Sequence, residues 1–340
     1  MASSPRRPVP APSDERVEGA LPPGQRVGAY QLERLVGTGG MGWVYQARHA
    51  YSARLAAIKV MREDQLTHDR AVDRMMREAA ILASVGHAGI PRFYECGLLD
   101  DRRPWIAMEL IAGSSLAHHM QLQHGGVCPA LVIDMICGVA QVLAAAHARG
   151  VTHRDLKPDN IFLTATDATF PVRVIDWGIA HHDAGARFTN MNEAIGTPTY
   201  MAPEQARGGP TDGHCDVYGL GVVAYHALTG RPPFLGQTSI EILVQHLNRP
   251  VPALAPRCPD APYGLVDLVE RMLVKNHTER PSAADVHREL DALRERTRAR
   301  DSAVRVAYVP DDTGEFVRTP PPTASMRQPA HDASVDLYDD

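Results

Sequence analysis

The sequence predicts an α+β fold of two lobes, in which an antiparallel sheet with one helix precedes a mostly helical region. Segments with the composition of strands come first, at 30–35, 43–47, 56–60, 92–97 and 105–110. Helical patterns come after Gly113, at 131–149, 216–228, 264–274 and 282–296. Strands grouped before helices indicate segregated elements, unlike the strand–helix alternation of a parallel sheet. The 340 residues are 44% apolar, which suffices for a buried core.

The strand segments are punctuated by glycines, and those at 43–47 and 56–60 are rich in β-branched or aromatic residues. Between the third and fourth strands, apolar side chains recur at helical spacing up to Gly86, namely Val72, Met75, Met76, Ala79 and Leu82. This spacing predicts one amphipathic helix that packs on the sheet.

The later helices carry end signals. Gly150 and Gly230 follow two of the helical patterns, and Ser282 with Asp285 three positions later forms an N-terminal cap for the last one. The segment 130–148 approaches the roughly 20 apolar residues that a membrane span needs. Because Asp134, Gln141 and His147 interrupt it, we expect a buried helix and no membrane span.

Both ends of the chain have the composition of unfolded segments. Residues 1–28 contain six prolines among small and charged residues, and residues 298–340 combine Pro320-Pro321-Pro322 with Ser, Thr and Asp. We therefore predict a disordered leader at 1–28, a folded domain at 29–297 and a mostly disordered tail at 298–340. The alternation at 304–308 leaves open a short edge strand or an incidental apolar cluster.

Charge and cysteine content restrict the function and the compartment. There are 35 basic and 40 acidic residues, a net charge of −5, which gives no electrostatic reason to expect nucleic acid or an anionic membrane as partner. The five cysteines are scattered without a C-x-x-C pair. No apolar leader of the secretory type is present at the N-terminus. We expect reduced thiols and a cytoplasmic protein.

A glycine-rich segment follows Val36. The run Gly37-Thr38-Gly39-Gly40-Met41-Gly42-Trp43-Val44 fits G-x-G-x-x-G-x-V, in which missing side chains let backbone amides approach phosphate oxygens. A dinucleotide-binding loop would need a strand before it and a helix after it. Here it lies between two strands, so a phosphate-binding hairpin and a plain glycine-rich hairpin remain.

Charged residues suited to phosphate chemistry follow. Lys59 ends an apolar strand close to the glycine loop, where it is either a surface lysine or the partner of Glu78 on the next helix. The most specific segment places a carboxylate, a cation and an amide in one turn after a helix, as His153-Arg154-Asp155-Leu156-Lys157-Pro158-Asp159-Asn160. Asp176-Trp177-Gly178 and Ala202-Pro203-Glu204 follow in that order.

With these motifs, residues 30 to about 297 resemble the eukaryotic-like serine/threonine protein kinases of bacteria. The resemblance implies a bilobal protein-kinase fold with an N-lobe at 29–111 and a C-lobe at 112–297. It also implies ATP as co-substrate and Mg²⁺ as metal, with Mn²⁺ as the alternative.

The resemblance assigns roles residue by residue. Lys59, held by Glu78, would contact the α- and β-phosphates, and Asp176 and Asn160 would hold the metal. Asp155 would orient the acceptor hydroxyl and take its proton, and Lys157 would neutralise the γ-phosphate. The remaining ATP contacts are the loop Val36, Gly37, Thr38, Gly39, Gly40, Met41 and Gly42, the adenine sandwich Val44, Ala57 and Leu163, the gatekeeper Met108 and the hinge from Glu109 to Ile111.

Other matched positions are structural or regulatory. The resemblance implies a pair between Glu204 and Arg280, and an Asp216 that ties down the catalytic-loop backbone. Thr189, eight positions before Thr197, matches an activating phosphothreonine, and its phosphate would pair with Arg154. Trp177 departs from the family pattern, which has Phe there.

Three functional classes follow, of which a protein serine/threonine kinase fits best. A scaffolding pseudokinase would lack one of the chemical residues, and this chain has all of them. A small-molecule phosphotransferase is disfavoured because Gly196-Thr197-Pro198 and Ala202-Pro203-Glu204 match a polypeptide-binding segment. The expected partners are proteins with Ser or Thr acceptors, and the resemblance makes a homodimer a candidate assembly.

Overall fold

The computed structural model describes residues 19–39, 42–63, 79–80, 82–123, 126–164, 170–177, 198–209 and 211–306, with 297–306 described by their backbone. The described residues up to Arg296 form one compact unit. That unit ends one residue before the predicted end of the folded domain at 297.

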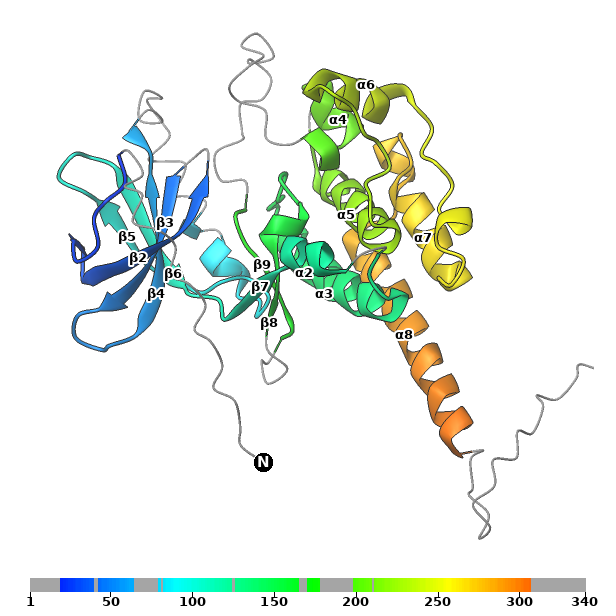
Figure 1. Ribbon diagram of the computed structural model, residues 1–340, viewed down its shortest axis with the longest axis horizontal. Coiled ribbons are helices and arrows are strands. Elements are labelled where there is room, and N and C mark those ends of the chain that lie inside the picture. Colours follow the sequence, from blue (N-terminus) through cyan, green and yellow to red (C-terminus); the bar gives the residue numbers. More distant parts are fainter. Residues whose placement is uncertain are drawn as a thin grey trace, which may run out of the picture. The chain divides into compact units, whose positions relative to one another are not determined.

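The N-lobe contains a six-stranded antiparallel sheet in the order β1-β2-β3-β4-β6-β5 (Figure 1). Its strands are β1 (Arg26–Val27), β2 (Tyr30–Gly39), β3 (Gly42–His49), β4 (Leu55–Met61), β5 (Phe93–Leu98) and β6 (Pro104–Glu109). Alternation explains the sheet, since Ala56, Ile58 and Val60 of β4 all lie in one apolar cluster with Tyr45. The five predicted strands are present, most of them longer than expected.

Residues 19–28 belong to this lobe, although their composition suggested an unfolded leader. Leu21 and Val27 are buried against the sheet. The Leu21 backbone N–H donates to the Tyr45 hydroxyl at 2.7 Å, and Arg103 donates to the Gly19 carbonyl at 3.1 Å. Burial of two aliphatic side chains and these two hydrogen bonds outweigh the local preference of a proline-rich segment for an open chain.

The helix predicted around 72–82 lies largely outside the described residues. Residues 79–80 and 82–85 are helical. Ala79 is buried with Met61 and Ile106, so the end of this segment packs on the sheet as its spacing predicted.

A second, three-stranded antiparallel sheet has the order β7-β8-β9, with β7 (Gly113–Ser115), β8 (Ile161–Thr164) and β9 (Val172–Val174). The strands have three or four residues each, too few for a periodic signal, and the sequence did not predict them as a sheet. The sheet matters for the predicted site because the predicted catalytic segments adjoin β8 and β9.

The C-lobe is helical, as expected. Its helices are α2 (Leu116–Leu122), α3 (Pro129–His147), α4 (Pro203–Ala206), α5 (Gly213–Thr229), α6 (Ser239–Asn248), α7 (Tyr263–Met272) and α8 (Ala283–Val306). Short 3₁₀ turns lie at η2 (Pro158–Asn160), η4 (Pro198–Tyr200), η5 (Ala255–Arg257) and η6 (His277–Glu279). In Figure 1, α3, α5 and α7 lie side by side, and Ile136, Leu220 and Leu268 from them share one buried core.

The end signals act as predicted. Gly230 caps α5 in the left-handed conformation, with φ of 72°, and Gly150 after α3 has φ of 73°. The Asp285 N–H donates to the Ser282 hydroxyl at 3.2 Å. The helix that follows runs to Val306, so residues 304–306 are helical and do not form an edge strand.

Among the described residues, α3 is the one helix that is long and apolar enough to cross a membrane. Eleven of its residues are buried, and ten of these lie in the same apolar cluster as residues of α5. In this structure α3 therefore occupies the position of a core helix.

Candidate active site

The register of the N-lobe sheet places several predicted nucleotide contacts on one face. Val44 pairs with Lys59, and Ala57 pairs with Met108. Because side chains alternate along a strand, Ala57 and Lys59 project from the same face of β4, and their cross-strand partners Val44 and Met108 project with them. A flat apolar ring such as adenine, bound on this face, would thus lie beside the Lys59 ammonium.

The glycine segment forms the hairpin between β2 and β3, where Gly37 pairs with Val44 and Gly39 with Gly42. Thr38 lies between them, and Val36 is exposed on β2 just before them. A Cβ atom on Gly42 would stand 2.2 Å from the Val60 carbonyl oxygen, so this position requires glycine. The predicted Gly40 and Met41 lie outside the described residues.

The remaining predicted adenine contacts lie on two more segments. Glu109 ends β6, and its backbone N–H donates to the Arg92 carbonyl at 2.8 Å, which fixes the start of the predicted hinge. Ile111 follows in that hinge and is half-buried. Leu163 lies on β8 of the second sheet, paired with Val172.

A buried carboxylate organises the catalytic loop. Asp216 on α5 accepts hydrogen bonds from the backbone N–H groups of His153 and Arg154, each at 2.7 Å, and from His147 Nε2 at 2.8 Å. Although burial favours the protonated form, the hydrogen bond and charge of His147 hold the pKa of Asp216 below its ordinary value. The ionised carboxylate is the acceptor that fixes the loop, as expected for Asp216.

Asp155, Lys157 and Asn160 converge at the end of that loop. Lys157 Nζ contacts Asp155 Oδ2 at 2.8 Å, and Asn160 Nδ2 donates to the Asp155 carbonyl at 2.8 Å. Asp155 and Lys157 are partly exposed, whereas Asn160 is buried. The structure therefore presents one carboxylate and one ammonium side by side at the surface of the loop.

The hydrogen bonds of His153 fix the orientation of its ring. The Asp155 backbone N–H donates to His153 Nδ1 at 3.2 Å, and His153 Nε2 lies 2.9 Å from the Ile175 carbonyl. Nδ1 thus accepts one hydrogen bond and Nε2 faces a carbonyl, so both ring nitrogens are engaged within the fold. The ring is fully buried and links the catalytic loop to the segment before Asp176, so it is not a catalytic acid or base.

Asp176 faces the sheet lysine. Lys59 Nζ lies 2.6 Å from Asp176 Oδ1, and Asp176 has a left-handed backbone with φ of 52°. Burial of the carboxyl acts against its ionisation, but the Lys59 ammonium prevails and lowers the pKa of Asp176. Glu78, the expected partner of Lys59, lies outside the described residues.

The oxygen atoms of Asp176 and Asn160 fit a hard divalent cation. Mg²⁺ takes carboxylate and amide oxygens together with substrate phosphates, and needs only one or two protein carboxylates. Because the amide nitrogen of Asn160 is engaged by the Asp155 carbonyl, coordination would use its oxygen. This donor set suits a divalent cation that prefers oxygen ligands.

Comparison with known proteins identifies the family. The family model described as protein kinase domain matches residues 30–290. The chain belongs to the protein kinase family. Its fold is similar to the crystal structure of the kinase domain of PknI from Mycobacterium tuberculosis, with a TM-score of 0.63 and 28% identity over 81% of this chain and 99% of that one.

Curated relatives are bacterial kinases. The chain is 34% identical over 312 residues to the serine/threonine-protein kinase pkn3 of Myxococcus xanthus, covering 89% of this chain and 56% of pkn3. It is 35% identical over 253 residues to PknA of Mycobacterium tuberculosis, covering 73% of this chain and 57% of PknA. This kinase chain thus spans little more than half the length of these relatives.

The predicted metal-binding segment of this kinase contains a tryptophan whose indole N–H makes a hydrogen bond. Trp177 is buried, its ring centroid lies 4.9 Å from that of His153, and its Nε1 donates to the Val174 carbonyl at 2.9 Å. Phenylalanine, the usual residue, has no such donor. The hydrogen bond ties Trp177 back to β9 and fixes the residue next to Asp176.

Replacing Trp177 with phenylalanine is expected to lower the free energy of unfolding by about 1–2 kcal/mol, because the Val174 carbonyl loses its donor and the pocket is underfilled. Thermal unfolding of both proteins checks this, and ATP affinity reports on Asp176. Equal unfolding midpoints would show that the indole hydrogen bond contributes nothing.

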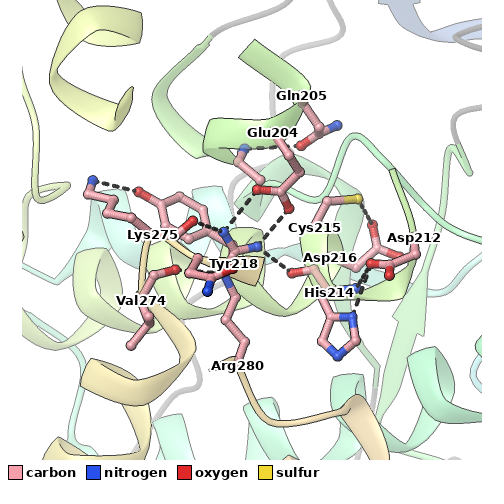
Figure 2. Close-up of polar contacts among 12 residues, drawn as sticks. Glu204, Gln205, Asp212, His214, Cys215, Asp216, Tyr218, Val274, Lys275 and Arg280 are labelled. Atoms are coloured by element: carbon pink, nitrogen blue, oxygen red, sulfur yellow. Dashed lines mark hydrogen bonds and ion pairs between the residues drawn. The ribbon is translucent and has the colours of Figure 1, made fainter. Parts of the chain in front are cut away.

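The predicted pair between Glu204 and Arg280 is present and bidentate, with Nη1–Oε1 at 2.7 Å and Nη2–Oε2 at 2.9 Å. Figure 2 shows the Arg280 guanidinium facing the Glu204 carboxylate beside Tyr218. Arg280 also donates to three backbone carbonyls, those of His214, Val274 and Lys275. The pair anchors α4, which follows the segment matched to peptide binding, to α5 and to the chain after α7.

Two residues that hold the site together are not evident from the sequence. His147 interrupts an apolar helical pattern there, and in the structure it donates to Asp216. Gln205 lies outside the recognised motifs, next to Glu204, and its amide donates to the Arg154 carbonyl. A polar residue within an apolar or motif-rich segment indicates that its side chain has a partner. The sequence does not show which partner, because the partners lie 69 and 51 residues away. Thr189, the predicted regulatory site, lies outside the described residues.

Proposed function

We propose that the chain is an ATP-dependent protein serine/threonine kinase. The arrangement that carries this proposal is the loop Asp155–Asn160, in which Asp155 and Lys157 are in contact, together with the Lys59–Asp176 pair. Such a set supplies an acceptor for a hydroxyl proton, two cations for phosphate and ligands for a metal. The curated relatives bear the name serine/threonine-protein kinase, which supports the choice of acceptor.

Each residue has a task in transfer of the γ-phosphoryl group. The serine or threonine oxygen bonds to the γ-phosphorus as the bond from that phosphorus to the β–γ bridging oxygen breaks, and ADP leaves. Asp155 accepts the hydroxyl proton and aligns the oxygen, while Lys157 offsets negative charge on the transferred group. Lys59 would exchange Asp176 for the α- and β-phosphates, which frees the carboxylate for the metal.

Asp176 and Asn160 would hold the cation, for which we propose Mg²⁺ with Mn²⁺ as the alternative. When bound, the metal would neutralise charge on the phosphate oxygens and so ease the approach of the acceptor hydroxyl to the γ-phosphorus. The substrates we propose are proteins, the chain itself included. We further propose a cytoplasmic setting, in keeping with five free cysteines among the described residues, and a homodimer, by resemblance alone.

Transfer of labelled phosphate from ATP tests the function. With Mg²⁺, we expect incorporation into serine and threonine of the chain itself and of a generic basic protein, and none into a sugar or an aminoglycoside. Incorporation into the small molecules alone would establish the phosphotransferase class instead. ATP binding without transfer to any acceptor would establish the scaffolding class.

Regulation by Thr189 gives a separate prediction. A phosphate adds about two negative charges at neutral pH, and Arg154, adjacent to Asp155, is the cation we propose to receive them. We expect mass spectrometry to find Thr189 phosphorylated in active protein, and Thr189→Ala to lower activity about tenfold or more. Active protein with unmodified Thr189 would contradict this prediction.

A further inference from the structure

The backbone of Arg154 is the strained point of the catalytic loop. Its φ of 65° lies in the left-handed region, which a residue with a Cβ adopts only where surrounding contacts enforce it. The Arg154 N–H is held by Asp216 Oδ1 at 2.7 Å. That bond fixes one side of the residue. In the peptide that follows, the Asp155 N–H donates to His153 Nδ1 at 3.2 Å, which leaves the Arg154 carbonyl to be fixed by another contact.

Gln205 provides that contact. Its Nε2 donates to the Arg154 carbonyl at 2.8 Å, and its Oε1 accepts from the Ala202 N–H at 3.0 Å. The two bonds use both ends of one amide, so the side chain has a single orientation that satisfies both. Gln205 therefore bridges the peptide that leads into Asp155 and the residue preceding α4.

The position of Gln205 is itself firmly set. Gln205 follows Glu204 in α4, and the Glu204 carboxylate is paired with the buried Arg280. Figure 2 shows the side chains of Glu204 and Gln205 adjacent on that helix. The bridge thus runs from the C-lobe core through α4 to the catalytic loop. A rotation of the Arg154–Asp155 peptide would break it and redirect the Asp155 carboxylate.

We propose that Gln205 is a positioning residue for phosphoryl transfer, which holds the strained Arg154 peptide and so aims Asp155 at the acceptor hydroxyl. The inference rests on the proposed kinase function, of which it names a further determinant. It predicts that Gln205 affects the chemical step and leaves ATP binding to Lys59, Asn160 and Asp176.

Gln205→Glu is the informative variant. Near pH 8 the introduced carboxylate would be ionised and could not donate to the Arg154 carbonyl, because two hydrogen-bond acceptors would then face each other. We therefore expect kcat to fall about tenfold or more, with KM for ATP unchanged. A protonated carboxyl can donate to that carbonyl and still accept from Ala202. The facing carbonyl raises the pKa of the introduced carboxyl above its ordinary value of about 4.3. The kcat deficit of Gln205→Glu relative to wild type should therefore shrink as the pH is lowered to about 5.5. The kcat deficit of Gln205→Ala should stay constant over the same pH range.

Gln245→Glu is the matched control. Gln245 also donates its amide to a backbone carbonyl, that of Leu235 at 2.7 Å, but it lies on α6, where its amide oxygen accepts from Arg249. We expect its kcat to equal that of wild type at every pH. An unchanged kcat in Gln205→Glu, or a deficit that does not vary with pH, would overturn the proposal.

Hydrogen exchange of residues 151–157 separates this inference from the proposed function, because it requires no activity. Exchange in this segment should be faster in Gln205→Ala than in wild type, and unchanged in Gln245→Glu. If wild type transfers no phosphate, the proposed function fails while exchange still reports on the bridge. Equal exchange in Gln205→Ala and wild type would refute the bridge. If Gln205→Ala does not fold, the exchange of residues 151–157 in Gln205→Glu, compared with wild type across the same pH range, tests the bridge instead.

Discussion

Asp155→Asn is expected to lower kcat for phosphate transfer by at least about 100-fold while ATP still binds. Asparagine can no longer take the hydroxyl proton, and its amide leaves Lys157 Nζ without the carboxylate that lies 2.8 Å away in the wild type. The groups that would hold ATP and metal, Lys59, Asn160 and Asp176, remain in place. The loss should therefore fall on kcat and spare the ATP dissociation constant.

Labelled-ATP kinetics and a binding titration of the same preparations provide the measurement. Asp159→Asn is the matched control, because Asp159 lies in the same loop and is exposed; its activity should remain within about twofold of wild type. An Asp155→Asn variant with near wild-type kcat would contradict the assignment of Asp155 as proton acceptor and orienting group.

Arg280→Ala is expected to have the largest effect on stability, a loss of about 3–5 kcal/mol. The wild-type guanidinium is buried, pairs with Glu204 through two nitrogens and donates to three backbone carbonyls. Without it, the Glu204 carboxylate remains buried with no counter-charge from this residue, and those carbonyls lose a donor. The unfolding midpoint should fall by roughly 10 °C.

Arg271→Ala tests whether burial is the reason for the large stability loss expected in Arg280→Ala. Arg271 also pairs with two carboxylates, those of Asp267 and Glu289, but its side chain is 41% exposed. We expect a loss of about 1 kcal/mol or less, because exposed ion pairs contribute little. Similar losses in the two variants, measured by thermal and denaturant unfolding, would show that burial does not set the contribution of Arg280.

Much of the fold follows from local patterns. Alternation in β4, the cap at Ser282 and the glycine after α5 each depend on residues within a few positions, so their physics is contained in a short window. The family motifs are local in the same sense, which is why the loop from Asp155 to Asn160 is recognisable from the order of its residues. The predicted leader boundary is wrong because Leu21 and Val27 are stabilised by a sheet that a window around them does not contain.

By itself, the sequence determined the kinase family, the two lobes and which charged and glycine residues belong to the candidate site. The order and spacing of the motifs along the chain suffice to recognise these. The resemblance also implied the Glu204–Arg280 pair and the anchoring of the catalytic loop by Asp216. Only the tertiary structure decided the other partners and the atoms that are in contact. Lys59 meets Asp176 across 117 positions, Asp216 receives the Arg154 N–H across 62, and Gln205 holds the Arg154 carbonyl across 51. Such contacts depend on how α4, α5 and the sheets pack, since a hydrogen bond requires atoms within about 3 Å and no local pattern encodes that distance.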